Sequence, residues 1–302
     1  MNRITGRSAF LALLKDEGVT HLFGNPGTTE LPIMHALKEY PDLTYVMAMQ
    51  ESLVVAIADG FSRASGRLVA CNVHVAPGLG NAMGALYNAK FTGTPMILTA
   101  GQQEQGHGLM EPMLYGPLVR IAEPLVKWAV EVTRLEDLPR IVRRAAKVAT
   151  TPPTGPVFIS LPGDILNSEV GVDLGRSTRV DTRVKPSDEA LQALVQRILR
   201  AEHPVIIAGD EVVKSDALDE AALLSLTARL SCLSAVSRLW RAFPVGEPVL
   251  HGGGIPRADA DPGHASSIRS DDRAWGGPAA HVGLQRRRSA AEWDGDRANR
   301  PR

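Results

Sequence analysis

The sequence predicts an α/β fold in which helices cover both faces of a parallel sheet. Two observations lead to this class. Short apolar runs alternate with longer segments of helical periodicity from the N-terminus to about residue 161. Most of these runs are apolar throughout, which is typical of parallel strands that are buried on both faces.

The predicted elements follow from apolar periodicity and from turn residues. Strands are expected at 21–24, 43–49, 68–75, 95–101 and 155–161, and helices at 5–18, 30–39, 51–66, 82–91 and 135–150. Thr5 can cap the first helix and Gly18 can end it. Residues 76–81 are expected to form a tight loop, because Pro77, Gly78 and Gly80 are common turn residues.

A second, incomplete α/β unit is expected after a linker. Residues 169–187 are polar and lack apolar periodicity, whereas 188–232 contain a predicted helix, a strand and another helix. Residues 1–168 therefore form the first predicted domain, and 233–302 form a tail.

The tail has two interpretations. No lysine follows Lys214, and Arg, Ala, Gly and Pro replace any periodic apolar pattern. This composition is usual for a disordered polar tail. The alternative is an aberrant segment produced by a reading frame broken near residue 232. In either case we expect nothing beyond about residue 230 to complete the second sheet.

Charge and composition exclude several classes of partner. The 33 Lys and Arg residues balance the 33 Asp and Glu residues, so we expect no nucleic-acid partner. No apolar run approaches the ~20 residues of a membrane span, and the N-terminus has no apolar signal core. Cys71 and Cys232 are too few for a disulfide framework or a metal site. We therefore expect a cytoplasmic protein with no membrane partner and no metal ligands in this chain.

Three loops that follow predicted strands should meet at one edge of the sheet, because parallel strands all end at the same edge. These loops are Asn25–Thr28, Gln50–Glu51 and His74–Asn81. Alone, Glu51 could be an acid favoured at a helix start, and His74 could be a core or surface histidine. Together they predict a ligand site around Glu51.

The motifs in these loops resemble a known family. They are FGNPGTTE at 23–30, QES at 50–52, ADGFSRASG at 58–66, HVAPGLGNAMGALYNA at 74–89 and TAGQQ at 99–103, extended by PLVKW at 124–128 and GPVFISLP at 155–162. The set resembles the N-terminal pyrimidine-binding domain of thiamine diphosphate-dependent enzymes, and within them the benzoylformate decarboxylase group. Acetolactate synthases are similar over the same domain, but less so. The resemblance is weaker over about 188–230.

The resemblance implies roles for individual residues. Glu51 matches the glutamate that hydrogen-bonds the aminopyrimidine ring of thiamine diphosphate and helps to activate it. His74 matches a histidine proposed to move protons on the substrate-derived intermediate. Thr28 takes the place of a serine that meets the substrate carboxylate, which leaves the substrate preference open. The remaining expected cofactor-binding residues, which line the pyrimidine pocket, are Asn25, Pro26, Gly27, Gly78 and Asn81.

The resemblance also implies that half of the cofactor site lies elsewhere. Complete members hold the diphosphate and Mg²⁺ with a Gly-Asp-Gly segment and a following Asn-Asn pair, and this chain lacks that combination. We therefore expect part of a 2-oxo acid decarboxylase that is inactive alone, whereas complete members form dimers or tetramers. Two alternatives are an acetolactate synthase-like fragment and a split subunit that completes its site with a separate diphosphate-domain chain.

Overall fold

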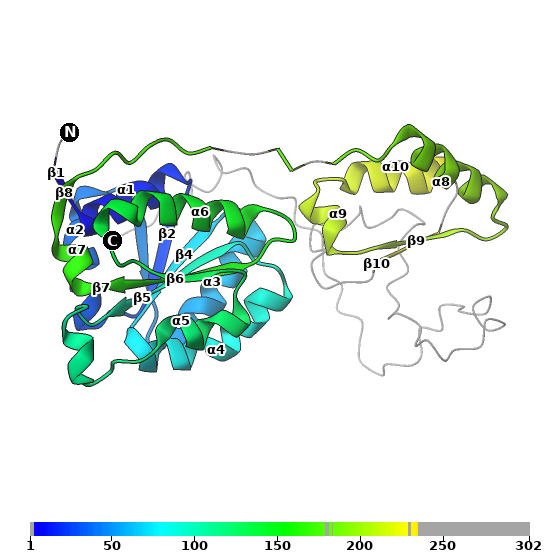
Figure 1. The fold of residues 1–302 in the computed structure, drawn as a ribbon. Coiled ribbons are helices and arrows are strands. Elements are labelled where there is room, and N and C mark those ends of the chain that lie inside the picture. Colours follow the sequence, from blue (N-terminus) through cyan, green and yellow to red (C-terminus); the bar gives the residue numbers. More distant parts are fainter. Residues whose placement is uncertain (1–2, 179–180, 183, 229–230, 235–302) are drawn as a thin grey trace, which may run out of the picture. The chain divides into compact units, whose positions relative to one another are not determined.

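The computed structural model describes residues 3–178, 181–182, 184–228 and 231–234. Its largest part is a six-stranded parallel sheet with the order β3-β2-β4-β5-β7-β6 (Figure 1). The strands are β2 (His21–Gly24), β3 (Thr44–Met47), β4 (Val69–Val73), β5 (Met96–Gln102), β6 (Ala129–Glu131) and β7 (Pro156–Pro162). The predicted α/β class is confirmed.

Helices cover both faces of this sheet (Figure 1). One face carries α1 (Gly6–Asp16), α2 (Leu31–Ala36), α6 (Leu138–Thr150) and α7 (Gly163–Asn167), and the other carries α3 (Glu51–Ser65), α4 (Val75–Phe91) and α5 (Leu118–Ala122). Short 3-10 turns complete the connections, namely η1 (Thr28–Glu30), η2 (Leu37–Glu39), η3 (His107–Met110), η4 (Glu123–Leu125) and η5 (Leu135–Asp137).

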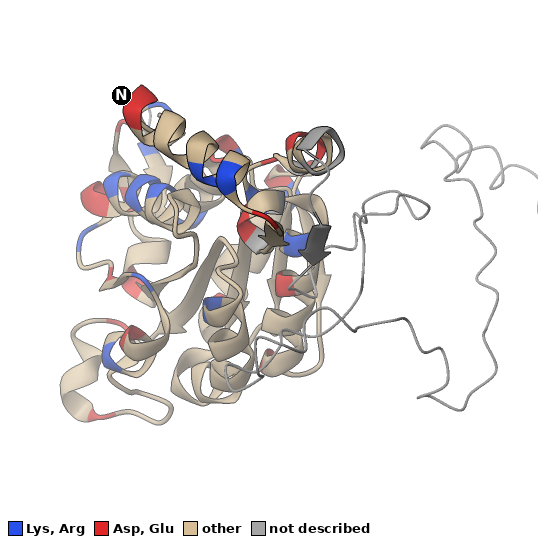
Figure 2. Ribbon diagram, turned by 90° about the vertical axis from the view of Figure 1, so that its right-hand side faces the viewer, with Lys and Arg blue, Asp and Glu red and all other residues tan. Residues whose placement is uncertain are grey.

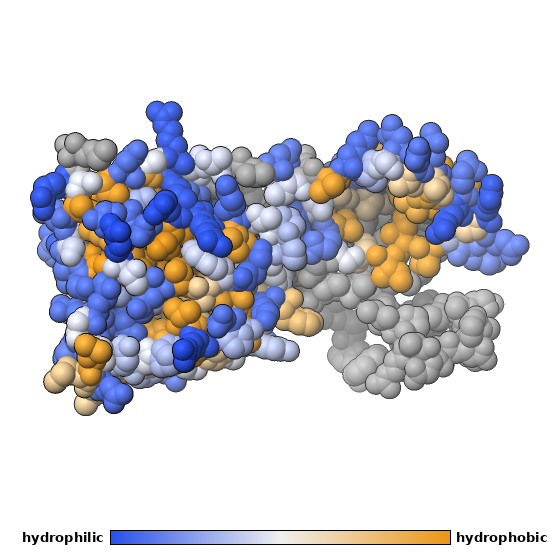
Figure 3. All heavy atoms as spheres, in the orientation of Figure 1, coloured by the Kyte–Doolittle hydropathy of each residue, from blue (hydrophilic) through white to orange (hydrophobic). Residues whose placement is uncertain are grey.

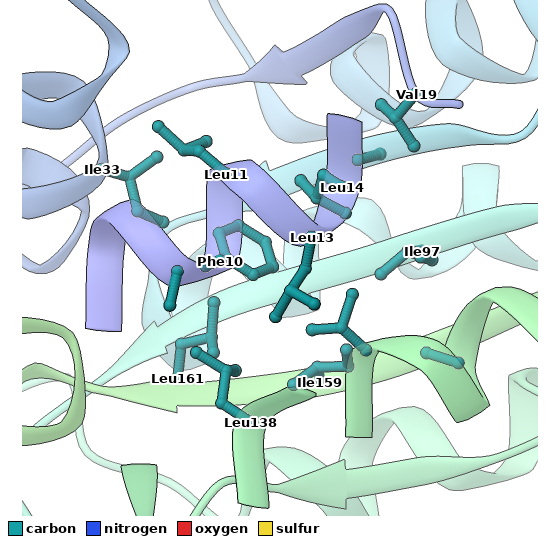
Figure 4. Packing of buried hydrophobic residues seen from close by; sticks show 14 of the residues in the cluster. Phe10, Leu11, Leu13, Leu14, Val19, Ile33, Ile97, Leu138, Ile159 and Leu161 are labelled. Carbon is teal, nitrogen blue, oxygen red and sulfur yellow. The ribbon is translucent and has the colours of Figure 1, made fainter. Parts of the chain in front are cut away.

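The core consists of two layers, one on each face of the sheet. Phe10 and Leu13 of α1 pack with Leu138 of α6 over Ile97 and Ile159 of the sheet (Figure 4). Every residue of β5 and of β7 is buried. Burial on both faces explains why these strands read as continuous apolar runs in the sequence.

The limits of α1 agree with the capping residues expected from the sequence. The Thr5 hydroxyl accepts a hydrogen bond from the Ser8 backbone N–H at 3.4 Å. Gly18 has a φ of 86°, a left-handed conformation that glycine adopts without steric cost just after a helix. Residues Arg3–Thr5 (β1) also pair antiparallel with Glu169–Gly171 (β8), so a strand forms at the start of the predicted linker.

The expected loop at 76–81 is wrong, because α4 already begins at Val75. Pro77 lies in the first turn of this helix, where a backbone N–H has no helical partner and its absence costs little. The Gly78 N–H donates to the His74 carbonyl oxygen at 2.8 Å and so forms the first helical hydrogen bond. The glycine-rich stretch is therefore a helix N-terminus.

The second unit contains the predicted helices and strand, together with an additional short helix and strand. Its elements are α8 (Asp188–Arg200), β9 (Val205–Ala208), α9 (Asp210–Lys214), α10 (Leu218–Ala228) and β10 (Ser231–Ser234). Ser231–Ser234 pairs parallel with β9, so a short strand that the sequence did not indicate follows residue 230 in a sheet of two strands among the described residues. The tail from residue 235 onwards lies outside the described residues. The domain boundaries at 168, 187 and 232 stay a prediction.

The second unit leaves one apolar stripe exposed. Leu191, Leu194, Val195 and Leu199 follow helical spacing along α8, and each is at least 43% exposed. Figure 3 shows apolar side chains gathered on this part of the chain. A stripe with this spacing is typical of a helix that packs against further structure.

The described surface mixes charges of both signs. Figure 2 marks residues of both charges along the ribbon. This distribution agrees with the equal numbers of acidic and basic residues in the sequence. None of the helices in the described part of the chain has both the length and the apolar character needed to cross a bilayer.

Candidate functional site

The order of the strands brings the three predicted loops to one edge of the sheet. β2 lies between β3 and β4, and β4 pairs with β5. Glu51 therefore follows β3, Asn25–Thr28 follows β2, and His74 follows β4. Neighbouring carboxyl ends of parallel strands are the usual position of a ligand site in this class of fold.

Glu51 is a buried carboxyl group at the start of α3. The side chain of the preceding Gln50 caps this helix by accepting hydrogen bonds from the backbone N–H groups of Ser52 and Leu53, at 2.7 and 3.3 Å. Glu51 is therefore not needed as a cap. Its side chain turns toward α4, where Asn81 Nδ2 donates to Glu51 Oε2 at 3.0 Å. Only 6% of Glu51 is exposed.

The second oxygen of Glu51 has no hydrogen-bond partner among the residues that the structure describes. A Cβ atom placed on Gly78 would lie 3.0 Å from this oxygen, Oε1. Glycine at this position therefore keeps space beside Oε1. Asn81 and Gly78 come from the first two turns of α4, so one helix holds one carboxyl oxygen of Glu51 and leaves the other open.

His74 belongs to a second cluster, built around Glu30. Glu30 is fully buried, and its Oε2 atom lies 2.7 Å from His74 Nδ1. The Thr29 hydroxyl donates to Glu30 Oε1 at 2.7 Å and lies 3.2 Å from the same His74 nitrogen. The backbone N–H groups of Gly27 and Gly101 donate to the two Glu30 oxygens, at 2.9 and 3.0 Å.

The two clusters share the N-terminus of α4. His74 is the residue that precedes this helix, and its carbonyl oxygen accepts from Gly78 N–H at 2.8 Å. Val75, the first residue of α4, has a φ of 46° although its side chain is β-branched. This conformation costs on the order of 1–3 kcal/mol and is concentrated at functional sites in proteins.

The other expected residues lie at the same edge with fewer contacts. Gly27 packs directly against the His74 ring, so a side chain at position 27 would collide with it. Asn25 and Pro26 are half-buried, and Thr28 is exposed at the start of η1. No side-chain hydrogen bond of Thr28 occurs within the described part of the chain. Its hydroxyl is thus accessible to a small ligand.

Comparisons with known proteins agree with this geometry. Residues 4–113 match the family model described as "Thiamine pyrophosphate enzyme, N-terminal TPP binding domain". Benzoylformate decarboxylase of Pseudomonas aeruginosa is 36% identical over 252 residues, which cover 82% of this chain and 47% of that protein. Residues 4–113 are therefore similar to the N-terminal domain of the thiamine pyrophosphate enzymes, and the first sheet with its helices is called the TPP domain below. Thiamine pyrophosphate, or TPP, is another name for thiamine diphosphate.

Solved structures and a second relative support the same assignment of the TPP domain. The crystal structure of benzoylformate decarboxylase from Polynucleobacter necessarius matches with a TM-score of 0.74 and 36% identity, over 82% of this chain and 46% of that one. The 4-hydroxybenzoylformate decarboxylase of Rhodococcus jostii matches with a TM-score of 0.71 and 33% identity, over 77% and 44%. The acetolactate synthase catalytic subunit of Aspergillus candidus is 28% identical over 77% of this chain and 34% of that protein.

This chain spans about half the length of the benzoylformate decarboxylases that it matches. The matched share is larger than the TPP domain alone, so the similarity extends beyond the first sheet. Among the described residues, no group of three or more His, Cys, Asp or Glu side chains could hold a metal ion. The Cys71 thiol is buried in the TPP domain, and this burial raises its pKa, so it is not a thiolate nucleophile at neutral pH.

The sequence did not indicate Glu30, Thr29 and Gly101 as parts of the site. Glu30 was expected only as the start of a helix. A usable signal was present, because Glu30 follows β2 by a short Gly- and Pro-containing loop, just as Glu51 closely follows β3. Glu30 and Glu51 are both acidic residues soon after a buried strand, so the position of Glu30 also indicates a ligand site at the carboxyl edge of the sheet.

Replacement of Gly101 by Ala should destabilise the TPP domain. A Cβ at this position would collide with the Glu30 carboxyl group and the Thr29 hydroxyl, both of which are held by other hydrogen bonds. We expect Gly101→Ala to lower the free energy of unfolding by about 1–3 kcal/mol. Urea unfolding followed by circular dichroism measures this change.

Gly60 provides the matched control for this substitution. It lies within α3, and a Cβ there would meet no atom within 4 Å. Gly60→Ala should raise the stability by roughly 0.5–1 kcal/mol, because alanine is the better helix former. Equal effects of the two substitutions would contradict the proposed crowding at Gly101.

Proposed function

We propose that this chain is the TPP-binding part of a 2-oxo acid decarboxylase of the benzoylformate decarboxylase type. The observation that carries the proposal is the open Oε1 atom of Glu51. One oxygen of this buried carboxyl group is held by Asn81, while the other faces the space that Gly78 keeps free. Such a group suits a hydrogen bond with a flat, nitrogen-containing ring.

The residues at this edge of the sheet fit the aminopyrimidine ring of the cofactor. Glu51 Oε1 would bind a ring nitrogen and exchange a proton with it, and Gly78 would let the ring approach the backbone of α4. Asn25, Pro26 and Gly27 would line the wall formed by the loop after β2. When bound, the cofactor supplies the carbon nucleophile and the electron sink that decarboxylation requires.

His74 and Thr28 would act on the substrate side of the site. The His74 ring is 22% exposed, so it can reach a bound molecule while its Nδ1 contacts Glu30. It would take or give a proton during the reaction. The exposed Thr28 hydroxyl would donate a hydrogen bond to the carboxylate of the 2-oxo acid. Its methyl group makes this part of the site bulkier than a serine would.

A diphosphate domain would complete the cofactor site. Exposed large apolar side chains on and before α3 and on α4, the two helices that carry Glu51 and Asn81, support this proposal. They are Met49, Leu53 and Ile57 on and before α3, and Tyr87 and Phe91 on α4. Exposed apolar groups in this number mark a contact surface more often than a free one. We propose that a diphosphate domain, with its Mg²⁺, binds here, supplied by a separate chain in the cytoplasm or, in complete members of the family, by another subunit of the homo-oligomer.

A decarboxylation assay tests the proposal. The purified chain with benzoylformate, TPP and Mg²⁺ should release no CO₂ above background, because it provides only one part of the cofactor site. Addition of a chain that contains a diphosphate domain should restore release. CO₂ release by the chain alone that depends on TPP would show that the incomplete-site proposal is wrong.

An acetolactate synthase-like activity is the second candidate, supported by the similarity to the Aspergillus candidus subunit. The two candidates differ in their products. With pyruvate as substrate, the completed enzyme would form acetolactate in the second case, and it would release an aldehyde from benzoylformate in the first. Product analysis of the same completed enzyme separates them.

A further inference from the structure

We propose that Glu30 is a positioning residue that fixes the tautomer of His74. In this arrangement His74 carries its proton on Nδ1, the ring nitrogen that faces Glu30, and its Nε2 is unprotonated. The inference concerns the ground state of the free protein, and its meaning for the reaction rests on the proposed function. Glu30 is not among the site residues expected from the sequence.

Glu30 accepts hydrogen bonds from the backbone on both of its carboxyl oxygens. Oε2 accepts from the Gly27 backbone N–H at 2.9 Å, and Oε1 accepts from the Gly101 backbone N–H at 3.0 Å. A backbone amide can only donate, so the direction of these two hydrogen bonds is fixed. Both Glu30 oxygens are therefore already used as acceptors toward the backbone.

One proton lies in the hydrogen bond between Glu30 and His74. Oε2 lies 2.7 Å from His74 Nδ1, a distance that requires a hydrogen bond and therefore one proton between these atoms. Because Glu30 is the acceptor, this proton belongs to Nδ1. A neutral imidazole has one protonated and one unprotonated nitrogen, so Nε2 is the unprotonated one.

Thr29 supports the same assignment. Its hydroxyl proton is directed to Glu30 Oε1, at 2.7 Å, so its oxygen has only lone pairs to offer His74 Nδ1 at 3.2 Å. Nδ1–H can then be shared between Glu30 and Thr29. With the opposite tautomer, the unprotonated Nδ1 would face the Glu30 acceptor, and the Thr29 hydroxyl could donate to Nδ1 only by turning its proton away from Glu30.

The surroundings keep this arrangement in place. Glu30 is fully buried, and a side chain at either Gly27 or Gly101 would occupy the space of the cluster. A ring held in this way would take or give its proton at Nε2, on the side away from Glu30. The same relation between a buried carboxylate and a histidine fixes the tautomer in other enzymes that use histidine as a base.

Nitrogen NMR of the full chain tests the inference without any cofactor. Long-range ¹H–¹⁵N correlation spectra of histidine-labelled protein distinguish protonated from unprotonated ring nitrogens. The spectrum is recorded well above the ordinary imidazole pKa of about 6.5, and loss of signals in His74→Asn assigns the ring. We expect Nδ1 to be protonated and Nε2 to be unprotonated. A His74 spectrum with the proton on Nε2 would overturn the inference.

The Glu30→Gln variant provides the second readout. Its side-chain amide no longer offers two acceptor oxygens, so the preference of His74 for a proton on Nδ1 should weaken and the population with the proton on Nε2 should rise. Glu123→Gln, at an exposed glutamate of the same domain, should leave the His74 tautomer unchanged. An unchanged tautomer in a folded Glu30→Gln protein would also overturn the inference, whereas the wild-type spectrum decides alone if this variant does not fold. Failure of thiamine binding would affect the proposed function and not the tautomer.

Discussion

Decarboxylation by this chain, once completed by a diphosphate domain, should fall about 10²- to 10⁴-fold when Glu51 is replaced by Gln. Glutamine keeps the shape of the side chain and can still make a hydrogen bond, but it has no proton to exchange with a ring nitrogen. The buried position of Glu51 means that no water can easily take over this role. The turnover number, measured at saturating cofactor, reports the loss.

A control variant and a binding measurement separate this effect on turnover from a general loss of structure. Glu123→Gln removes a charge from an exposed position and should leave the rate within about twofold, because surface substitutions seldom exceed ±0.5 kcal/mol. In the chain alone, Glu51→Ala should weaken thiamine binding by roughly 1.5–3 kcal/mol, as expected for loss of a hydrogen bond to a charged group. Amide signals of Gly78 and Asn81 follow this binding by NMR. An unaltered rate in Glu51→Gln would remove Glu51 from the chemistry.

Local patterns in the sequence sufficed for the fold class and for the place of Glu51. Apolar runs predicted strands because β4, β5 and β7 are buried on both faces, so their sequences carry no polar alternation to confuse the interpretation. Glu51 was predicted at a strand-to-helix junction, and α3 does begin at this residue. Its contact with Asn81 follows from the order of the strands, which a parallel topology restricts strongly.

The Glu30 cluster could not be predicted in the same way. Its hydrogen bonds join Glu30 to His74 and to Gly101, which lie 44 and 71 residues further along the chain. No local pattern encodes such contacts, because they depend on how β2, β4 and β5 align in the sheet. The start of α4 was missed for another reason. Gly78 and Gly80 resemble turn residues, but both lie in α4, and Gly78 allows the close approach of this helix to Glu51.

The largest expected loss of stability comes from Phe158→Ala. Phe158 is fully buried in β7, and its neighbours in the sheet are Leu98 of β5 and Ala129 of β6. Removal of a buried phenylalanine side chain costs about 3–5 kcal/mol, since the cavity closes only in part. Native domains are stable by only about 5–15 kcal/mol, so this loss is a large share of the total. Urea unfolding of the full chain, followed by circular dichroism, measures it.

Phe91 provides a matched control for Phe158→Ala, because it is also a phenylalanine but lies on the surface. It ends α4 and is 84% exposed, so Phe91→Ala should change the stability by no more than about 0.5 kcal/mol. Phe158 also lies on the strand next to β5, whose Gly101 holds Glu30. Loosening this part of the sheet should therefore disturb the His74 cluster before the domain unfolds. If Phe158→Ala and Phe91→Ala lowered the stability equally, the assignment of β7 to the centre of the core would be wrong.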